Sequence, residues 1–286
     1  MVNKSSGKNS GAYFSFDTTK NSEVTYRISI SYVSIDNAKA NLKASRIEGG
    51  INAYKKNAES AWDSSLAKIK IESPNNDRKT QFYTHLYHSL IHPNIVSDIN
   101  GEYIGADYRV HKTKLEDQYS SFSVWDTYRT QAQLLAMLYP RKSSDMMQSL
   151  VDFATQSGGY GRWILANVET GIMQGDPTPT LISNSFAFGA TNFDLKTAYE
   201  YMNQGATIPK LRSQDHEIRP YLKEYIRDGH TFSSMMLEYT TSDFAIGQFA
   251  FQAIGNKADA SYFIERSQNW KNIYNPENKW LNSRYP

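Results

Sequence analysis

The sequence contains no cysteine, and this absence excludes several kinds of chemistry at once. A chain without cysteine has no disulfide bond, no thiolate metal ligand and no cysteine nucleophile. Its apolar runs stay well below the roughly 18 residues that a membrane-spanning helix needs. Residues 1–8 are basic and polar and lack the apolar core of a secretory signal peptide. We therefore predict no membrane insertion and expect no signal peptide within these residues.

An excess of charge of either sign is also missing. Thirty-one basic and 29 acidic residues leave a net charge of +2, so the chain has no general attraction to nucleic acid or to an anionic membrane. Hydrophobic residues make up 40% and charged residues 21% of the sequence, which is an ordinary globular composition. A chain of 286 residues can bury a substantial core, as one large domain or as one domain with part of another.

Aromatic residues are abundant, at 13% of the chain with 20 Tyr and 5 Trp. Most of them are accounted for as residues at the edge of a hydrophobic core. The remainder are suited to carbohydrate binding, because aromatic rings pack against the apolar faces of sugars while polar neighbours bind the hydroxyl groups. Composition by itself supports carbohydrate binding only weakly.

The N-terminal part reads as the end of a sheet domain. The first dozen residues are rich in Ser, Gly and Asn and are expected to be disordered. Apolar and polar residues then alternate across residues 24–33, which predicts a strand with one buried face, and residues 13–16 could pair with it. A single strand is not stable alone. We therefore interpret residues 1–35 as a disordered start followed by the last strands of a β-sandwich.

The rest of the chain is predicted to be helical. Residues 36–75 read as linker helices over 36–45 and 51–71, and the Pro-Asn-Asn-Asp run at 74–77 marks a domain boundary. Residues 76–286 form a mainly α domain. In it we expect a helix ending at His92-Pro93, a helix over 125–138 closed by Pro140, and a third capped by Ser143 or Ser144 and stopped at Gly158. Further helices are expected near 179–189, 194–202, 220–227, 233–254 and 259–274.

Two motifs each suggest a specific binding site that the rest of the sequence does not support. His85, His88 and His92 share one side of a helix, as metal ligands could, but no ligand from a second element accompanies them. We interpret them as histidines packed on an amphipathic face. The glycine-rich run at 158–161 is not followed by Gly-Lys-Ser/Thr and does not follow a strand, so it is not a phosphate-binding loop.

Two other stretches combine tryptophan with ionisable side chains. Residues 122–129 read Phe-Ser-Val-Trp-Asp-Thr-Tyr-Arg, and residues 161–171 read Gly-Arg-Trp-Ile-Leu-Ala-Asn-Val-Glu-Thr-Gly, followed by Gly175-Asp176. A ring platform beside a carboxylate or a guanidinium is what sugar recognition requires. A buried tryptophan with salt-bridged neighbours explains the same pattern equally well, so spacing alone leaves both readings open.

These stretches, together with residues 81–103, resemble the helical domain of family 92 glycoside hydrolases. Residues 24–42 resemble the end of the β-sandwich that precedes it, so the similarity runs in order from about residue 14 to the end of the chain. The resemblance implies a mainly α fold, a partial (α/α)6 barrel preceded by the end of a β-sandwich.

In function, the resemblance implies a calcium-dependent exo-α-mannosidase that acts with inversion on mannose-containing glycans, such as N-glycans or mannan, with α-1,2 linkages favoured. Export to the periplasm or the extracellular space is also implied. Trp125 and Asp126 would bind the terminal mannose. Weaker candidates for the same pocket are Arg162, Trp163, Glu169 and Asp176.

The resemblance also has gaps. The family's catalytic acid in a Gly-Asn-Glu-Pro motif and its base in an Asp-rich loop do not occur in this sequence, and about eight helices fall short of the twelve that the barrel needs. We therefore expect an incomplete catalytic domain without a catalytic residue of its own. The acid Glu and the base Asp are expected beyond Pro286, and the calcium ligands are expected largely in the same missing part.

The sequence departs from the family's pattern at one further position, and three alternatives to the mannosidase function remain. The family usually has His after Gly-Asp, where this chain has Pro177. The alternatives to a mannosidase are a catalytically incomplete carbohydrate-binding helical module, another glycosidase or lyase on a toroid of helices, and a helical interaction scaffold.

Overall fold

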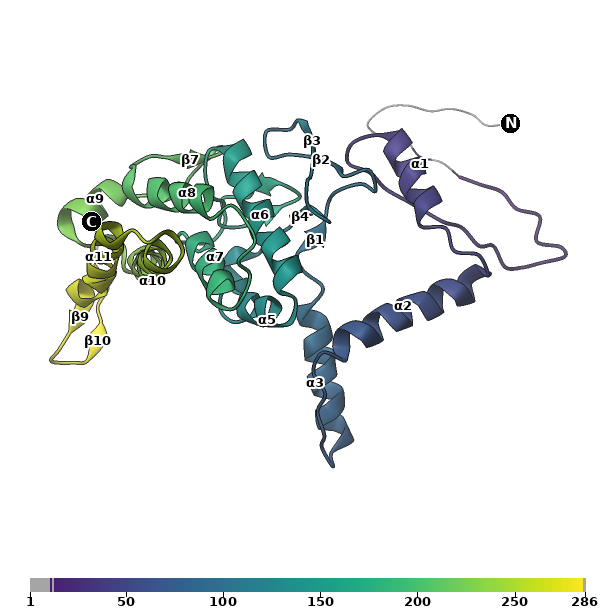
Figure 1. Ribbon diagram of the computed structural model, residues 1–286, viewed down its shortest axis with the longest axis horizontal. Helices are drawn as coiled ribbons and strands as arrows, with labels where there is room; N and C mark the ends of the chain where they lie inside the picture. The colour runs from purple at the N-terminus through teal and green to yellow at the C-terminus, as the bar shows by residue number, and fades with distance from the viewer. Residues whose placement is uncertain (1–10, 12, 285–286) are drawn as a thin grey trace.

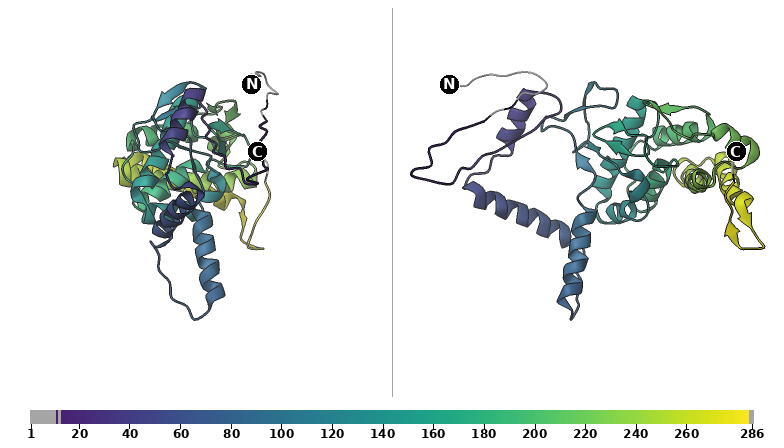
Figure 2. Two further views of the ribbon diagram at one scale, coloured as in Figure 1. Left: turned by 90° about the vertical axis from the view of Figure 1, so that its right-hand side faces the viewer. Right: turned by 180° about the vertical axis from the view of Figure 1, so that it is seen from behind.

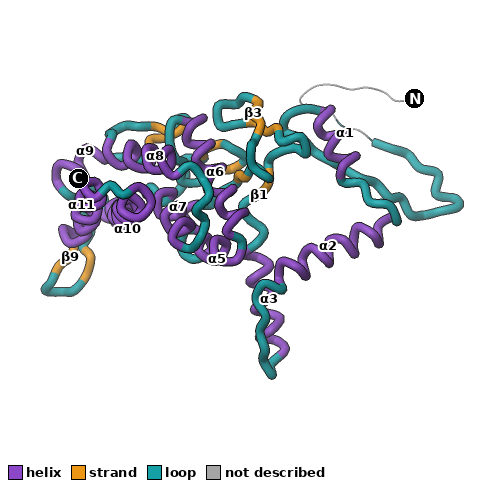
Figure 3. Tube along the Cα trace, in the orientation of Figure 1, coloured by secondary structure: helices purple, strands orange, loops and turns teal. Residues whose placement is uncertain are grey.

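The chain folds mainly into α-helices, as a computed structural model shows for residue 11 and residues 13–284 (Figures 1 and 3). The expected disorder of the first dozen residues lies almost wholly outside this described part, and so does Pro286, beyond which the catalytic acid and base are expected. No helix in the described residues is long and apolar enough to span a bilayer. The body is built from helices α5 to α11, while helices α2 (Gly50–Leu66) and α3 (Asn76–Ser89) project from it (Figure 2).

Alternate helices of the body form two layers. Helices α5 (Gln131–Leu138), α7 (Thr178–Ala187) and α10 (Ser233–Phe249) pack side by side with α7 in the middle. Helix α6 (Pro140–Ser157) packs on α5, α8 (Leu195–Thr207) lies against α6 and α10, and α11 (Lys257–Arg266) packs on α10. This alternation of chain between two layers is the arrangement of successive helical hairpins in an (α/α) barrel.

The core lies between these layers and contains Leu150, Phe153, Ile182, Met202, Phe249 and Phe263, all nearly or fully buried. A second, smaller cluster forms where α9 (Leu222–Asp228) meets α10, around Tyr225 and Tyr239. A π-helical turn, Ala250–Ile254, continues α10, and a 3-10 helix, Ser267–Ile273, continues α11.

The strands are short and pair only in twos within the described residues. The pairs are β1 (Asn94–Ile95) with β4 (Tyr119–Ser120), β2 (Glu102–Ile104) with β3 (Val110–Lys112), β5 (Ile164–Leu165) with β6 (Val168–Glu169), β7 (Arg212–Ser213) with β8 (His216–Glu217), and β9 (Tyr274–Asn275) with β10 (Trp280–Leu281), all antiparallel. They connect helices rather than form a sheet.

The strand expected over residues 24–33 is absent from the described residues, so that prediction is wrong. The side chains that should share a buried face are exposed, with Ile28 at 76% and Ile30 at 68% of their full accessibility. The reason is physical: a strand needs a hydrogen-bonded neighbour, and this segment has none within the described residues. Ser31, near the end of this segment, donates a hydrogen bond to the Asp98 carboxylate, which also accepts from Asn37 and Asn41 of the helix Ile35–Ala44 that follows.

The helical predictions were closer, with two corrections. The segment 125–138 is not one helix but two, α4 (Val124–Thr127) and α5. Helix α6 begins at Pro140 and not at Ser143 or Ser144, because proline suits the first helical position, where no N–H donor is needed. Its expected end is confirmed, since Gly158 adopts a left-handed φ of 92°. The helices near 36–45, 51–71 and 194–202 are also confirmed, with Ser34 and Asp194 as side-chain caps.

Candidate functional site

The short helix α4 presents Trp125 and Asp126 at the surface of the body. Val124, fully buried, anchors the helix in the core, while Trp125 is half-buried and Asp126 is exposed. The Asp126 carboxylate accepts a hydrogen bond from the Ser123 hydroxyl, which orients it. Its position and exposure leave it accessible to a ligand.

Arg129 covers the aromatic residues of α4. Its guanidinium lies 4.6 Å from the ring centre of Trp125 and 4.7 Å from that of Tyr128, close enough for cation–π attraction. Glu238 of α10 holds this group in place, because its carboxylate accepts hydrogen bonds from Arg129 and from the Tyr128 hydroxyl, each 3.2 Å long. Burial, aided by the negative charge of Glu238, raises the pKa of Tyr128 to about 12, so this hydroxyl stays protonated and donates.

Glu169 organises the loop of residues 161–177, which follows α6. Its side chain is almost fully buried and accepts hydrogen bonds from the backbone N–H groups of Arg162 at 2.7 Å and Gly171 at 2.9 Å. Burial raises the pKa of Glu169 against the opposing effect of these donors. A side chain at Gly161 would collide with this carboxylate, because a Cβ there would overlap Oε2.

Arg162 and Trp163 lie in the same loop with different surroundings. The Arg162 guanidinium donates to the carbonyl oxygens of Met173 at 3.3 Å and Glu217 at 2.7 Å, and so joins the two ends of the loop to β8. The Trp163 side chain is half-buried, and its carbonyl accepts from the backbone and hydroxyl of Thr170. Trp163 therefore supplies a half-buried aromatic ring, whereas the Arg162 guanidinium is engaged by carbonyl oxygens.

Asp176 belongs to a buried ion network. Its carboxylate accepts from the Arg219 Nε at 2.8 Å, and Arg219 also contacts Asp243 at 2.6 Å. Asp243 in turn accepts from Arg266 at 2.6 and 2.7 Å and from the Tyr225 hydroxyl at 2.9 Å. Asp176 is buried, so its carboxylate faces the interior, and this burial raises its pKa despite Arg219.

The structure brings helix α4 and the 161–177 loop together. The Ile164 N–H donates to the Phe122 carbonyl at 2.9 Å, and the Asn167 N–H donates to the Ser120 hydroxyl at 2.8 Å. Gly175 packs directly on Glu238, so the far end of the loop rests on the residue that holds Arg129. Of the six residues singled out in the sequence, Trp125, Asp126 and Trp163 expose part of their side chains on these two segments, whereas Glu169 and Asp176 turn inward.

Arg129 and Glu238 were not singled out as site residues, and neither were Arg219 and Asp243. Arg129 stands within the Trp-Asp-Thr-Tyr-Arg run, so its spacing from Trp125 on a helical turn was a usable signal. Glu238 lies 109 positions further along the chain, and no local pattern connects the two.

No cluster of carboxylates and histidines marks a metal site within the described residues. Among them, no group of three or more His, Asp or Glu side chains is arranged to hold a metal ion. The buried carboxylates of Asp176 and Asp243 are matched by arginine, so they are poor donors for a cation. Within the same part of the chain, the histidines of α3 form no such group either.

The catalytic acid and base remain a matter of prediction. They were expected beyond Pro286, which itself lies outside the residues that the structure describes. Of the three carboxylates predicted for the sugar site, Glu169 and Asp176 are buried and already bonded, and Asp126 is exposed.

Comparison with solved structures gives clear matches. A family GH92 α-mannosidase from Bacteroides thetaiotaomicron is 26% identical with a TM-score of 0.78, over 89% of this chain and 34% of that one. The same enzyme in complex with mannoimidazole gives a TM-score of 0.79. A GH92 inverting mannosidase from the same bacterium has a TM-score of 0.80 at 23% identity, a likeness that bears on the fold alone.

The chain spans about a third of the length of these structures, with 34% and 36% of the two enzymes covered. A search of curated proteins found no match. Residues 37–286 match the glycosyl hydrolase family 92 catalytic domain, which is most of the sequence. The partial barrel of alternating helices agrees with these matches, and the chain belongs to glycoside hydrolase family 92.

Proposed function

We propose that this chain forms part of the sugar-binding wall of an exo-acting α-mannosidase. The single observation that carries the proposal is the exposed carboxylate of Asp126 beside the half-buried ring of Trp125 on α4. A carboxylate can accept hydrogen bonds from adjacent sugar hydroxyls while an aromatic ring packs against the apolar face of the sugar. The matched enzyme that binds mannoimidazole supports mannose as the sugar.

The proposed reaction is inverting hydrolysis of terminal α-mannosides of N-glycans or mannan, with α-1,2 linkages favoured. Membership of the family supports this reaction. Such hydrolysis needs a carboxylic acid and a carboxylate base about 6.5–9.5 Å apart. Glu169 is saturated by backbone donors and Asp176 is paired with Arg219, so neither is free for these roles. This supports an acid and a base beyond Pro286, and calcium dependence and export from the cytoplasm belong to the same proposal.

The first test is binding of mannoimidazole to this chain by isothermal titration calorimetry. Asp126→Asn should weaken binding about tenfold to a hundredfold, because hydrogen bonds to a charged group contribute about 1.5–3 kcal/mol. The control is Asp63→Asn, which changes an exposed aspartate on α2 and should leave the affinity unchanged. Equal affinity of the Asp126 variant and the unmodified chain would remove α4 from the sugar site.

The second test is mannose release from α-1,2-mannobiose with calcium and again with EDTA. We expect no release from the folded chain, because the acid and the base are proposed to lie beyond Pro286. Calcium-dependent release would contradict the incompleteness of the site. The alternative, a catalytically incomplete carbohydrate-binding module, predicts mannoimidazole binding without hydrolysis even from a longer product of the same gene.

A further inference from the structure

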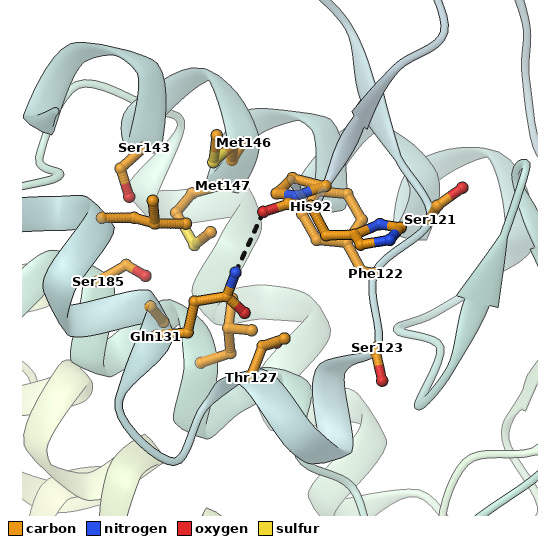
Figure 4. A pocket seen from close by; sticks show the side chains of 14 residues that line it. His92, Ser121, Phe122, Ser123, Thr127, Gln131, Ser143, Met146, Met147 and Ser185 are labelled. Atoms are coloured by element: carbon orange, nitrogen blue, oxygen red, sulfur yellow. Dashed lines mark hydrogen bonds between the residues drawn. The ribbon is translucent and has the colours of Figure 1, made fainter. Parts of the chain in front are cut away.

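A small cavity lies behind helix α4, between α5, α6 and α7 (Figure 4). Its walls are mainly apolar and include Phe122, Leu135, Met146, Met147 and Leu181. Measured as the space open to the centre of a water molecule, its volume is about 30 Å³. That is enough for one or two waters, since a single water needs about 10–15 Å³ on this measure.

Two serine hydroxyls line this cavity without a partner among the described residues. Ser143 of α6 is 1% exposed and Ser185 of α7 is fully buried, and neither Oγ makes a hydrogen bond to that part of the protein. Figure 4 shows the two side chains among those that surround the cavity. The amide of Gln131, which also lines it, already donates to the carbonyl oxygens of Ser89 and His92.

Neighbouring serines on the same two helices do find partners. On α6, the Ser144 hydroxyl donates to the Pro140 carbonyl at 2.8 Å, the usual bond of a serine within a helix. On α7, the Ser183 hydroxyl donates to the Ala245 carbonyl at 3.0 Å. Ser143 and Ser185 differ from them in facing an open space rather than a carbonyl oxygen.

We propose that this cavity is an internal hydration site, which holds one or two ordered waters bound to Ser143 and Ser185. Burying a hydroxyl without a hydrogen bond costs about 1–3 kcal/mol, so two such groups on one cavity favour an occupant that both donates and accepts. The volume excludes a sugar ring, and the lining residues include no carboxylate for a metal ion and no lysine or arginine for an anion. Water meets all three conditions of size, charge and hydrogen bonding.

The location gives the site a structural consequence. The residues that line the cavity include Ser121, Phe122 and Ser123, which directly precede α4, and Thr127, the last residue of α4. The bound water therefore fills the space beneath α4 that side chains leave open. This inference rests on the cavity alone and is independent of the proposed mannosidase function.

The test is a high-resolution crystal structure of the chain with and without Ser185→Ala, joined to thermal unfolding of both. We expect density for water within hydrogen-bond distance of Ser143 or Ser185, its loss or weakening in Ser185→Ala, and a midpoint of unfolding lowered by about 2–4 °C. Ser143→Ala should act in the same way. Ser144→Ala is the matched control on α6, because its hydroxyl has protein partners and its loss should leave the cavity water in place.

An empty cavity would overturn the proposal, and it would change the effect of Ser185→Ala on the midpoint of unfolding to the opposite direction. If the hydroxyls are buried without any partner, removing one relieves a desolvation penalty, so Ser185→Ala would keep or raise the midpoint of unfolding while Ser144→Ala lowers it. Density for an alcohol or another additive in place of water would equally contradict a hydration site.

Discussion

The carboxylates of this chain show how one chemical group takes different roles according to its partners. Asp126 is exposed, Glu169 is saturated by backbone N–H donors, and Asp176 and Asp243 share Arg219. From the sequence, Asp126 was the main candidate for a sugar ligand, and Glu169 and Asp176 were weaker candidates for the same pocket. Arg219, which separates Asp176 from the others, lies 43 positions away and carries no local mark.

Asp243 allows a prediction about pH at this scale. Burial alone would raise the pKa of its carboxyl, but Arg219 and Arg266 outweigh burial and hold the pKa below the usual aspartate value. A carboxyl with a lower pKa in the folded than in the unfolded state adds stability above its unfolded pKa, and this stability is lost as the pH falls through the folded pKa. The relevant window therefore lies below about pH 4.

We expect Asp243→Asn to reduce the free energy of unfolding by about 3–5 kcal/mol at pH 7, because it leaves two buried guanidinium groups with too little negative charge. The variant should also lose less stability than the unmodified chain between about pH 4 and pH 2. Urea unfolding at several pH values measures both effects. Asp176 is present in both proteins, and its raised pKa depends in part on the negative charge of Asp243. Parallel pH profiles for the two proteins would contradict the role given to Asp243.

At the scale of the elements, the 161–177 loop depends on close approach to α10. Gly175 has a φ of 91°, and a Cβ added there would overlap the Cβ of Glu238. We expect Gly175→Ala to destabilise the chain by about 2 kcal/mol or more, through a strained backbone and a displaced Glu238. Because Glu238 holds Arg129 over Trp125, the emission of the tryptophans should change as well.

The control for this variant is Gly255→Ala. Gly255 has a similar φ of 76° but nothing within 4 Å of an added Cβ among the described residues, so it reports the backbone strain without the collision. The difference between the two variants in chemical unfolding isolates the contact with Glu238. If Gly255→Ala costs as much as Gly175→Ala, the packing of the loop on α10 contributes nothing measurable.

Local signals in the sequence predicted most of the helices. They did not predict features that depend on contacts between residues far apart in the chain. Caps such as Asp194 and stops such as Gly158 act within one helical turn, so they can be read from the sequence. The break between α4 and α5 could not be read in this way. It is stabilised at the Tyr128 carbonyl by amide donors from Gln133 and from Asn184, which lies 56 positions away. The strand prediction for residues 24–33 is wrong for a related reason: the local pattern is that of a strand, but the segment has no partner strand within the described residues.

For the whole molecule, the two-layered body leaves apolar surface uncovered along α10 and its π-helical continuation. Phe244 is 50% and Phe251 is 56% exposed, and Phe244 also lines a groove between α5, α7 and α10. Phe188, just after α7, is 45% exposed. Exposed apolar side chains of this kind favour association between copies in water.

We therefore expect the chain to self-associate as its concentration rises, and the double substitution Phe244→Ser with Phe251→Ser to shift it toward monomer. Light scattering coupled to size-exclusion chromatography over a range of concentrations measures the mass directly. Trp280→Ser is the matched control, because Trp280 is 73% exposed on the β9–β10 hairpin, away from the α10 surface. If the control abolishes association and the double substitution does not, the copies associate through the β9–β10 hairpin and not through the α10 surface. Monomer at all concentrations would show that the exposed phenylalanines are tolerated without a partner.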